Sequence, residues 1–143
     1  MAVSKARLCT VGLFVALLVG ACGDSDALSG DKATYVAQID PICTELQSKV
    51  GDLGSNAEAQ AKDVEAAVGR MRGISKPGED SERADVYIAA MENLYLSLQD
   101  VDQSRRVNDQ PRAQRAQEMA RINNENAAKA AKEYGMVACA QPL

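Results

Sequence analysis

Residues 84–101 read A-D-V-Y-I-A-A-M-E-N-L-Y-L-S-L-Q-D-V, and this stretch gives the clearest indication of the fold class. Its apolar positions, with successive gaps of 3, 4, 3, 4 and 3, are Ala84, Tyr87, Met91, Leu94, Leu98 and Val101. That spacing places one apolar stripe along a helix, because a helix turns about once every 3.6 residues. The stretch therefore predicts an amphipathic helix that packs against other elements.

Three more segments carry the same helical spacing. The first stripe contains Val36, Ile39, Cys43, Leu46, Val50 and Leu53, and the second contains Ala57, Ala61, Val64, Val68 and Met71. The last segment, about 111 to 134, is rich in alanine and places on one face Ala116, Ala120, Asn123, Ala127, Ala130 and Tyr134. No strand-like alternation competes, so we predict an all-α fold, an up-down-up-down four-helix bundle closed by one disulfide.

The ends of these segments carry turn and capping residues. Asp40 and Pro41 interrupt the first stripe, but the stripe stays in phase, so we expect one kinked helix. The alternative is a helix that restarts with Asp40 as its cap and Pro41 in its first turn. Ser55 and Glu58 predict a capping box for the second helix. Gly135 suits the left-handed position that ends the fourth helix.

The N-terminal residues predict an exported, lipid-anchored protein. Lys5 and Arg7 precede an apolar run, Leu8–Ala21, which ends in L-L-V-G-A-C at residues 17–22. This order resembles the lipobox of bacterial lipoproteins, with Cys22 at the lipidated position. The resemblance implies a signal peptide over residues 1–21, a diacylglycerol and palmitate anchor on Cys22, and localisation to the extracytoplasmic face of the cell membrane. An ordinary secretory signal or an uncleaved anchor is the alternative, although a membrane span needs about 20 apolar residues.

Two further parts of the chain follow the predicted signal peptide. Residues 22–31 read as the lipidated cysteine and a short flexible tether, because they are small, polar and acidic. Residues 32–143 form the predicted helical bundle domain. Because the tether enters at the first helix, the turn at 74–78 should lie near the membrane. The turns at 51–55 and 107–111 should face away from it.

Two cysteines remain after the signal peptide and the lipidated residue, Cys43 and Cys139. Outside the cytosol such a pair favours a disulfide, which would close a loop of about 95 residues and stabilise the fold by roughly 4–5 kcal/mol. A metal site would need more Cys or His, and a redox pair would normally be C-x-x-C. In an up-down bundle Tyr134 should approach Tyr35, and the chain after Gly135 can run back along the first helix to Cys43.

The composition excludes several classes of function. The chain has no His and no Trp, and its 20 acidic and 16 basic residues give a net charge of −4. Ser-His-Asp and Cys-His catalysis are therefore excluded, and a basic nucleic-acid footprint is absent. Glu79, Asp80 and Glu82 crowd a helix start, where the helix dipole explains them better than a metal does. We predict no enzymatic activity, no cofactor, no metal and no nucleic-acid partner.

A few residues are candidates for a binding site. Asn123 lies on the alanine stripe, so we expect a buried amide that fixes helix register. The alternatives are a polar pocket beside a tyrosine, or an exposed Asn run if the face is off by one position. A ligand carrier would hold a small or amphiphilic ligand near Tyr87, Tyr95 and Asn123, in a cavity lined by Met71, Met91 and Met119.

The charge is uneven, with an acidic excess in residues 22–100 and a basic excess in residues 101–143. We favour attraction between neighbouring helices as its cause. The alternative is a basic patch on the last helix for an acidic partner or lipid head groups.

Beyond the lipobox, the chain resembles small helical lipoproteins and secreted proteins of actinobacteria, mostly of unknown function. The similar residues are Tyr35-x7-Cys43 on the first helix and Tyr134-Gly135-x3-Cys139 near the end, and Pro41 is a departure. The resemblance implies a disulfide-closed helical domain outside the cell membrane and no substrate. We predict a binding or scaffolding module with an envelope protein as partner; the alternative is the ligand carrier.

Overall fold

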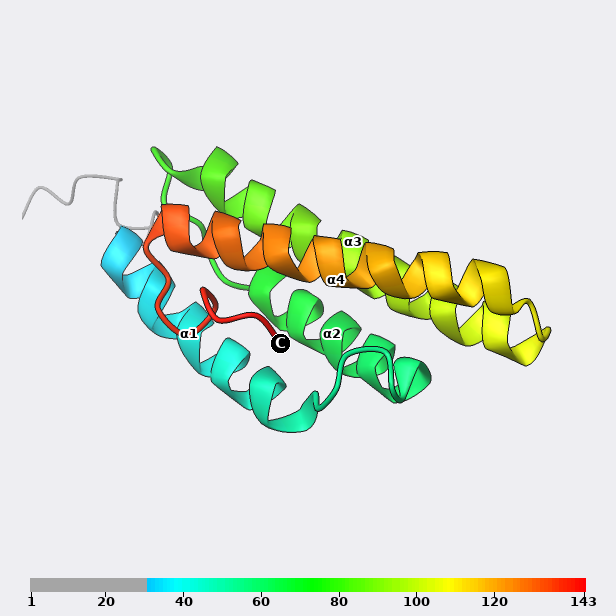
Figure 1. Cartoon of the computed structure of the whole chain (residues 1–143). Helices are drawn as coiled ribbons and strands as arrows, with labels where there is room; N and C mark the ends of the chain where they lie inside the picture. Colours follow the sequence, from blue (N-terminus) through cyan, green and yellow to red (C-terminus); the bar gives the residue numbers. More distant parts are fainter. Residues whose placement is uncertain (1–30) are drawn as a thin grey trace, which may run out of the picture.

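The computed structural model describes residues 31–143, which fold as four helices (Figure 1). Their bounds are Lys32–Lys49 for α1, Ala57–Arg72 for α2, Ser81–Arg106 for α3 and Gln110–Tyr134 for α4. No β-strand occurs in this part of the chain, so the predicted all-α, four-helix class is confirmed. The predicted signal peptide, the predicted lipidation site at Cys22 and most of the predicted tether lie outside the described residues.

Helices that are neighbours in the sequence are neighbours in space. α2 packs on both α1 and α3, and α3 packs along α4. The α3–α4 pair extends beyond the other two helices at one end of the molecule (Figure 1). α1 and α4 make no direct backbone contact; residues 136–143, called the C-terminal segment below, run between them. The up-down-up-down order of all four helices stays a prediction.

α1 is one continuous helix although it contains Pro41. Asp31 caps its start by accepting a hydrogen bond from the Thr34 N–H at 2.7 Å. Proline has no N–H, so the carbonyl of Ala37 lacks its usual helical partner. The ring of Pro41 is exposed, whereas Ile39 is fully buried. The proline therefore removes one hydrogen bond without displacing a core side chain.

The start of α2 differs from the prediction. Its cap is Asn56 rather than Ser55, and Glu58 pairs with Arg106 at 2.7 Å instead of closing a capping box. The buried side chain of Gln60 explains the difference, because it fixes the loop before α2. It donates to one loop carbonyl at 2.9 Å and accepts from one loop N–H at 2.7 Å.

Gly135 ends α4 in the left-handed conformation, as predicted. Its φ is 100°, and its N–H donates to the carbonyl of Ala131 at 3.0 Å. Glycine adopts this conformation without steric cost because it has no Cβ. The chain therefore turns sharply at the end of α4 and enters the C-terminal segment.

Aliphatic side chains, alanines and three tyrosines form the core. The predicted approach of Tyr134 to Tyr35 is confirmed: their ring centroids lie 5.7 Å apart, with an interplanar angle of 66°. Such an edge-on arrangement matches the charge distribution of aromatic rings. The tyrosine pair joins the start of α1 to the end of α4.

The buried face of α4 is offset by one position from the predicted face at two places. Asn124 and Ala131 are buried, with 6% and 0% of their surface exposed, where we expected Asn123 and Ala130. Both sets of positions fit a helical period, and alanine occurs in each, so the sequence of α4 does not discriminate between them. The neighbouring C-terminal segment decides, because Asn124 binds the backbone of Leu143.

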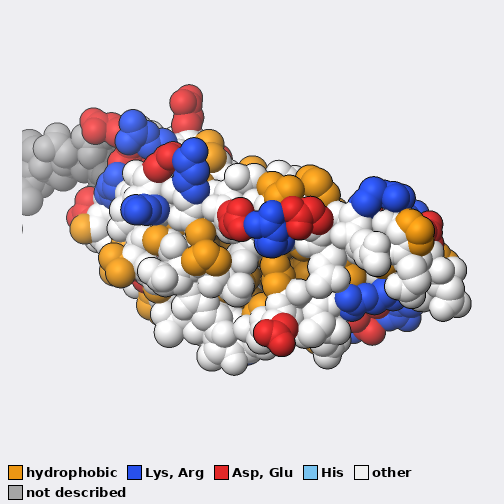
Figure 2. All heavy atoms as spheres, viewed as in Figure 1, with side chains coloured by type: hydrophobic (Ala, Val, Ile, Leu, Met, Phe, Trp, Pro, Cys, Tyr) orange, Lys and Arg blue, Asp and Glu red, His pale blue; other side chains and the backbone are white. Residues whose placement is uncertain are grey.

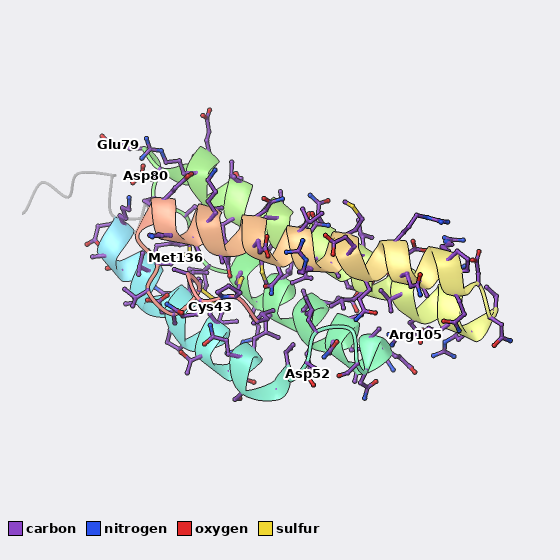
Figure 3. All side chains as sticks on the ribbon, in the orientation of Figure 1. Cys43, Asp52, Glu79, Asp80, Arg105 and Met136 are labelled. Carbon is purple, nitrogen blue, oxygen red and sulfur yellow. A yellow bond between two sulfur atoms is a disulfide. The ribbon has the colours of Figure 1, made fainter. Side chains whose placement is uncertain are left out.

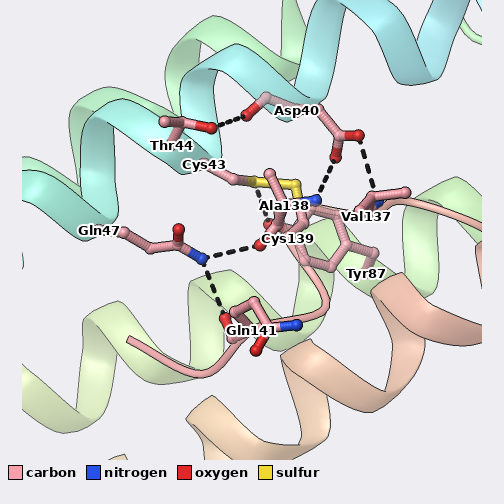
Figure 4. Close-up of a disulfide and its surroundings, with 9 residues drawn as sticks. All are labelled: Asp40, Cys43, Thr44, Gln47, Tyr87, Val137, Ala138, Cys139 and Gln141. Atoms are coloured by element: carbon pink, nitrogen blue, oxygen red, sulfur yellow. Dashed lines mark hydrogen bonds between the residues drawn. A yellow bond between two sulfur atoms is a disulfide. The ribbon is translucent and has the colours of Figure 1, made fainter.

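Cys43 and Cys139 form the predicted disulfide, with their Cα atoms 5.1 Å apart and a separation of 96 positions in sequence. Figure 4 shows the C-terminal segment beside α1 at this bond. The chain thus turns at Gly135 and returns along the first helix, as the sequence predicted.

Candidate functional site

One side of α3 presents an exposed hydrophobic side chain between two hollows. Leu94 and Leu98 point into the core and are fully buried. Leu96 lies two positions from each, about 200° around the helix, and is 55% exposed. It lines a hollow of about 490 Å³ between α3 and α4 and one of about 450 Å³ between α2 and α3. Leu96 and these two hollows are called the α3 face below.

The hollow between α3 and α4 combines hydrophobic and charged side chains. Met119 of α4 lines it and is 48% exposed. Arg112 of α4 pairs with Asp100 of α3 at 2.5 Å, and Arg115 lines the same hollow. Protein interfaces commonly have a hydrophobic centre and a polar rim, so this composition suits contact with an amphipathic protein surface.

Asn123 also lines the hollow between α3 and α4, where it links the two helices. Its Nδ2 donates to Oγ of Ser97 at 2.8 Å and to the carbonyl of Asn93 at 3.2 Å. The side chain is half-buried rather than buried. Asn123 therefore forms a polar link at the edge of the hollow, and the buried amide that we expected is that of Asn124.

The hollow between α2 and α3 contains Tyr95. Its hydroxyl donates to Oε1 of Glu65 at 3.4 Å and accepts from Nε2 of Gln99 at 2.5 Å. The pKa of Tyr95 is raised above its ordinary value. The main cause is loss of solvent contact, and the second cause is the negative charge of Glu65. Tyr95 and Glu65 also line an adjoining hollow of about 380 Å³, so the depression continues along α2.

The structure places the three predicted ligand-binding side chains apart. Tyr87 lies in the core, 1% exposed, and its hydroxyl donates to Sγ of Cys43 at 3.1 Å. Burial is the main reason why the pKa of Tyr87 is raised. Tyr95 lies on the α2 side of α3, and Asn123 lies on the α4 side. No single site among the described residues unites the three, and the carrier function stays a prediction.

The three methionines do not line one cavity either. Met71 and Met91 are core residues, 0% and 3% exposed, whereas Met119 is 48% exposed on the outside of α4. The methionine cavity that would favour a ligand carrier is therefore not formed by these residues, because the helical period of α4 turns Met119 away from the core.

Charged side chains are paired locally over the surface. Figure 2 shows basic and acidic side chains interspersed on the face that it displays. Arg121 pairs with Glu118 and with Glu125 on the same helix, both at 2.5 Å. Asp80 of the predicted acidic cluster pairs with Lys32 at 3.2 Å. Such exposed pairs contribute about 0–1 kcal/mol each, so they organise the surface more than they stabilise the fold.

Leu96 and the Arg112–Asp100 pair were not singled out from the sequence. The sequence does hold a signal for Leu96, since it is a large hydrophobic residue outside the 3-4 stripe of its helix. The sequence gives no such signal for the ion pair between Arg112 and Asp100, because these two residues meet only when α3 and α4 pack side by side.

Comparison with known proteins identified no relative: no protein-family model, no curated protein and no solved structure matches this chain. Within residues 31–143, no three potential metal ligands of the Cys, Asp and Glu types are grouped so as to hold an ion. Over the same residues, no helix has both the length and the hydrophobicity needed to span a membrane.

Proposed function

We propose that this protein is a lipid-anchored, non-catalytic binding module on the extracytoplasmic face of a bacterial cell membrane. The anchor rests on the lipobox-like run at residues 17–22, which ends at Cys22. The disulfide Cys43–Cys139 supports an oxidising compartment, where such bonds persist. The resemblance to small helical lipoproteins of actinobacteria agrees with both points.

The observation that carries the binding role is the exposed Leu96 between two hollows on the α3 face. Leu96 and Met119 both line the hollow between α3 and α4, and an exposed hydrophobic patch with a polar rim is typical of a protein-binding site. Met119 adds a second exposed hydrophobic side chain in the hollow towards α4. We propose an envelope protein as the partner that covers this face.

The arrangement of the ends suits a tethered domain. Figure 3 places Glu79 and Asp80 at the end of the molecule where α1 begins, and Asp52 and Arg105 well away from that end. A tether joined to α1 would hold the first end near the membrane. The α3 face runs between the two ends, where a partner in the envelope could reach it.

Membrane fractionation tests the anchor. Cys22→Ala should move the protein from the membrane fraction into the soluble fraction, because it removes the atom that carries the lipid. Cys9→Ala is the matched control, since it changes a cysteine within the apolar run and should leave the protein in the membrane fraction. Unchanged membrane retention of Cys22→Ala would refute the anchor.

Chemical cross-linking in intact cells tests the partner. Leu96→Asp should reduce the yield of the cross-linked complex by at least about ten-fold, as expected for a central interface residue. Val107→Asp is the matched control, because Val107 is 65% exposed at the end of α3 and lies outside the α3 face. Equal yields for both variants would contradict a partner on the α3 face.

A further inference from the structure

The C-terminal segment is bound by α1 chiefly through its main chain (Figure 4). The carboxylate of Asp40 accepts hydrogen bonds from the N–H groups of Val137 and Ala138, both at 3.1 Å. The amide of Gln47 donates to the carbonyls of Ala138 and Gln141, at 2.7 and 3.2 Å. Main-chain contacts of this kind give affinity for a chain segment, and side-chain contacts add specificity.

Side chains of the segment supply that specificity. Met136 is 1% exposed and Cys139 is 5% exposed, so both are anchored in the interior. Cys139 is bonded to Cys43. At the far end of the segment, Asn124 of α4 binds the N–H and the carbonyl of Leu143. The segment is therefore recognised at both of its ends and at its centre.

The segment is separable from the helices that bind it. Its covalent link to α4 is the single residue Gly135, whose left-handed φ of 100° marks a sharp turn without a side chain. α1 and α4 have no direct backbone contact, so departure of the segment would break no contact between these two helices. Domain swapping, the exchange of an identical element between two copies of a chain, is a low-cost route to a dimer.

We infer that the surface formed by Asp40, Cys43, Gln47 and Asn124, called the segment seat below, also binds the C-terminal segment of a second copy of this chain. A second copy is the occupant because its segment has the same sequence and reproduces every contact described above. In the resulting dimer, Cys139 of each copy is bonded to Cys43 of the other.

Thiol–disulfide exchange supplies a balanced route to this dimer. A small thiolate attacks Sγ of Cys139, forms a mixed disulfide with it and releases Cys43 as a thiolate. The freed segment then enters the seat of a second copy. The Cys43 thiolate of that copy attacks Sγ of the incoming Cys139 and expels the small thiolate. The thiolate is regenerated, so no net oxidant or reductant is consumed.

Complementary cysteine variants test the inference. Both use the full chain in detergent and carry Cys9→Ser and Cys22→Ser, so that only the cysteines of interest remain. One variant adds Cys43→Ala and offers a segment, and the other adds Cys139→Ala and offers a seat. The two are mixed in a glutathione redox buffer, and disulfide-linked dimers are separated by non-reducing electrophoresis and identified by mass spectrometry. Circular dichroism verifies that each variant is folded.

The inference predicts that the mixed dimer, linked by Cys139 of one chain and Cys43 of the other, exceeds each self-dimer by at least about ten-fold, equivalent to about 1.4 kcal/mol. A statistical mixture of the three dimers would overturn it, because random collision would then explain the pairing. Absence of the mixed dimer would overturn it as well.

A variant of the segment separates recognition from cysteine reactivity. Adding Met136→Ala to the chain that offers Cys139 should reduce the mixed dimer several-fold, because Met136 is 1% exposed in the seat and the competing segment of the other chain keeps its methionine. Adding Val137→Ala, at a side chain that is 74% exposed, is the matched control and should leave the yield unchanged. Equal yields for the two would show that the seat does not recognise the segment.

Discussion

The side-chain amide of Asn124 holds the backbone of Leu143 through two hydrogen bonds. Its Nδ2 donates to the Leu143 carbonyl at 3.0 Å, and its Oδ1 accepts from the Leu143 N–H at 3.1 Å. Asn124 is 6% exposed on a face otherwise made of alanine and tyrosine. Both hydrogen-bond partners of the buried amide thus belong to Leu143, 19 positions away in sequence, and the amide ties the C-terminal segment to α4.

Replacing this amide should destabilise the protein. Asn124→Ala removes two hydrogen bonds and leaves two partly buried backbone groups of Leu143 without partners. We expect the free energy of unfolding to fall by about 1–3 kcal/mol, measured by urea denaturation. Asn126→Ala, at an exposed position on the same helix, should change it by less than about 0.5 kcal/mol. Similar losses for both variants would contradict the role of Asn124.

Replacing Pro41 should stabilise α1. Pro41→Ala restores an N–H that can donate to the Ala37 carbonyl, and the exposed ring leaves no cavity. We expect the free energy of unfolding to rise by up to about 3 kcal/mol. Pro111→Ala is the control: Pro111 lies in the first turn of α4, where the missing N–H costs little. A loss of stability in Pro41→Ala would show that α1 depends on the proline.

Three tyrosines should make the fold sensitive to alkali. Burial raises the pKa of Tyr35 to about 12 and also raises the pKa values of Tyr87 and Tyr134. The native state therefore retains these protons at a pH where the unfolded chain, with pKa values of about 10, loses them. Stability should be complete below pH about 10 and should fall as the pH rises towards 12.

Tyrosinate absorbance and circular dichroism, followed together, test this pH dependence. The absorbance of Tyr35, Tyr87 and Tyr134 should rise in step with the loss of helix. Tyr95→Phe should lower the total rise and leave the loss of helix unchanged, because Tyr95 is half-exposed on the α3 face. A gradual rise without unfolding would contradict the burial of the three hydroxyls.

Arg105 should contribute more to the free energy of unfolding than Arg115, which is exposed on the surface of α4. Its guanidinium donates to the Gly54 carbonyl at 2.5 Å and to Oε1 of Gln117 at 3.3 Å, so one side chain of α3 reaches the loop before α2 and the helix α4. Arg105→Ala should lower the free energy of unfolding by about 1.5–3 kcal/mol. Arg115→Ala, at the exposed surface of α4, should lower it by less than about 0.5 kcal/mol.

Much of the fold could be predicted from local patterns. Gaps of three and four residues indicated all four helices, and Gly135 marked the end of the last one, because these features depend on backbone geometry alone. The start of α2 was misplaced by one residue, since the choice between Ser55 and Asn56 depends on how the buried Gln60 holds the preceding loop. The site was harder to predict: Asn123 lies in it, Tyr95 lies in a separate part of it, and Tyr87 lies in the core.

The helical class, the pairing of Cys43 with Cys139 and the approach of Tyr35 to Tyr134 could all be predicted from the amino-acid sequence. The helical class follows from the 3-4 periodicity, the pairing from the two cysteines that remain after residue 22, and the approach of the tyrosines from antiparallel helices joined by short turns. Which asparagine of α4 is buried, and what fills the space between α1 and α4, became clear only from the tertiary structure. A helix rich in alanine fits its neighbours in more than one rotation, and contacts with a distant segment of the chain select one of them.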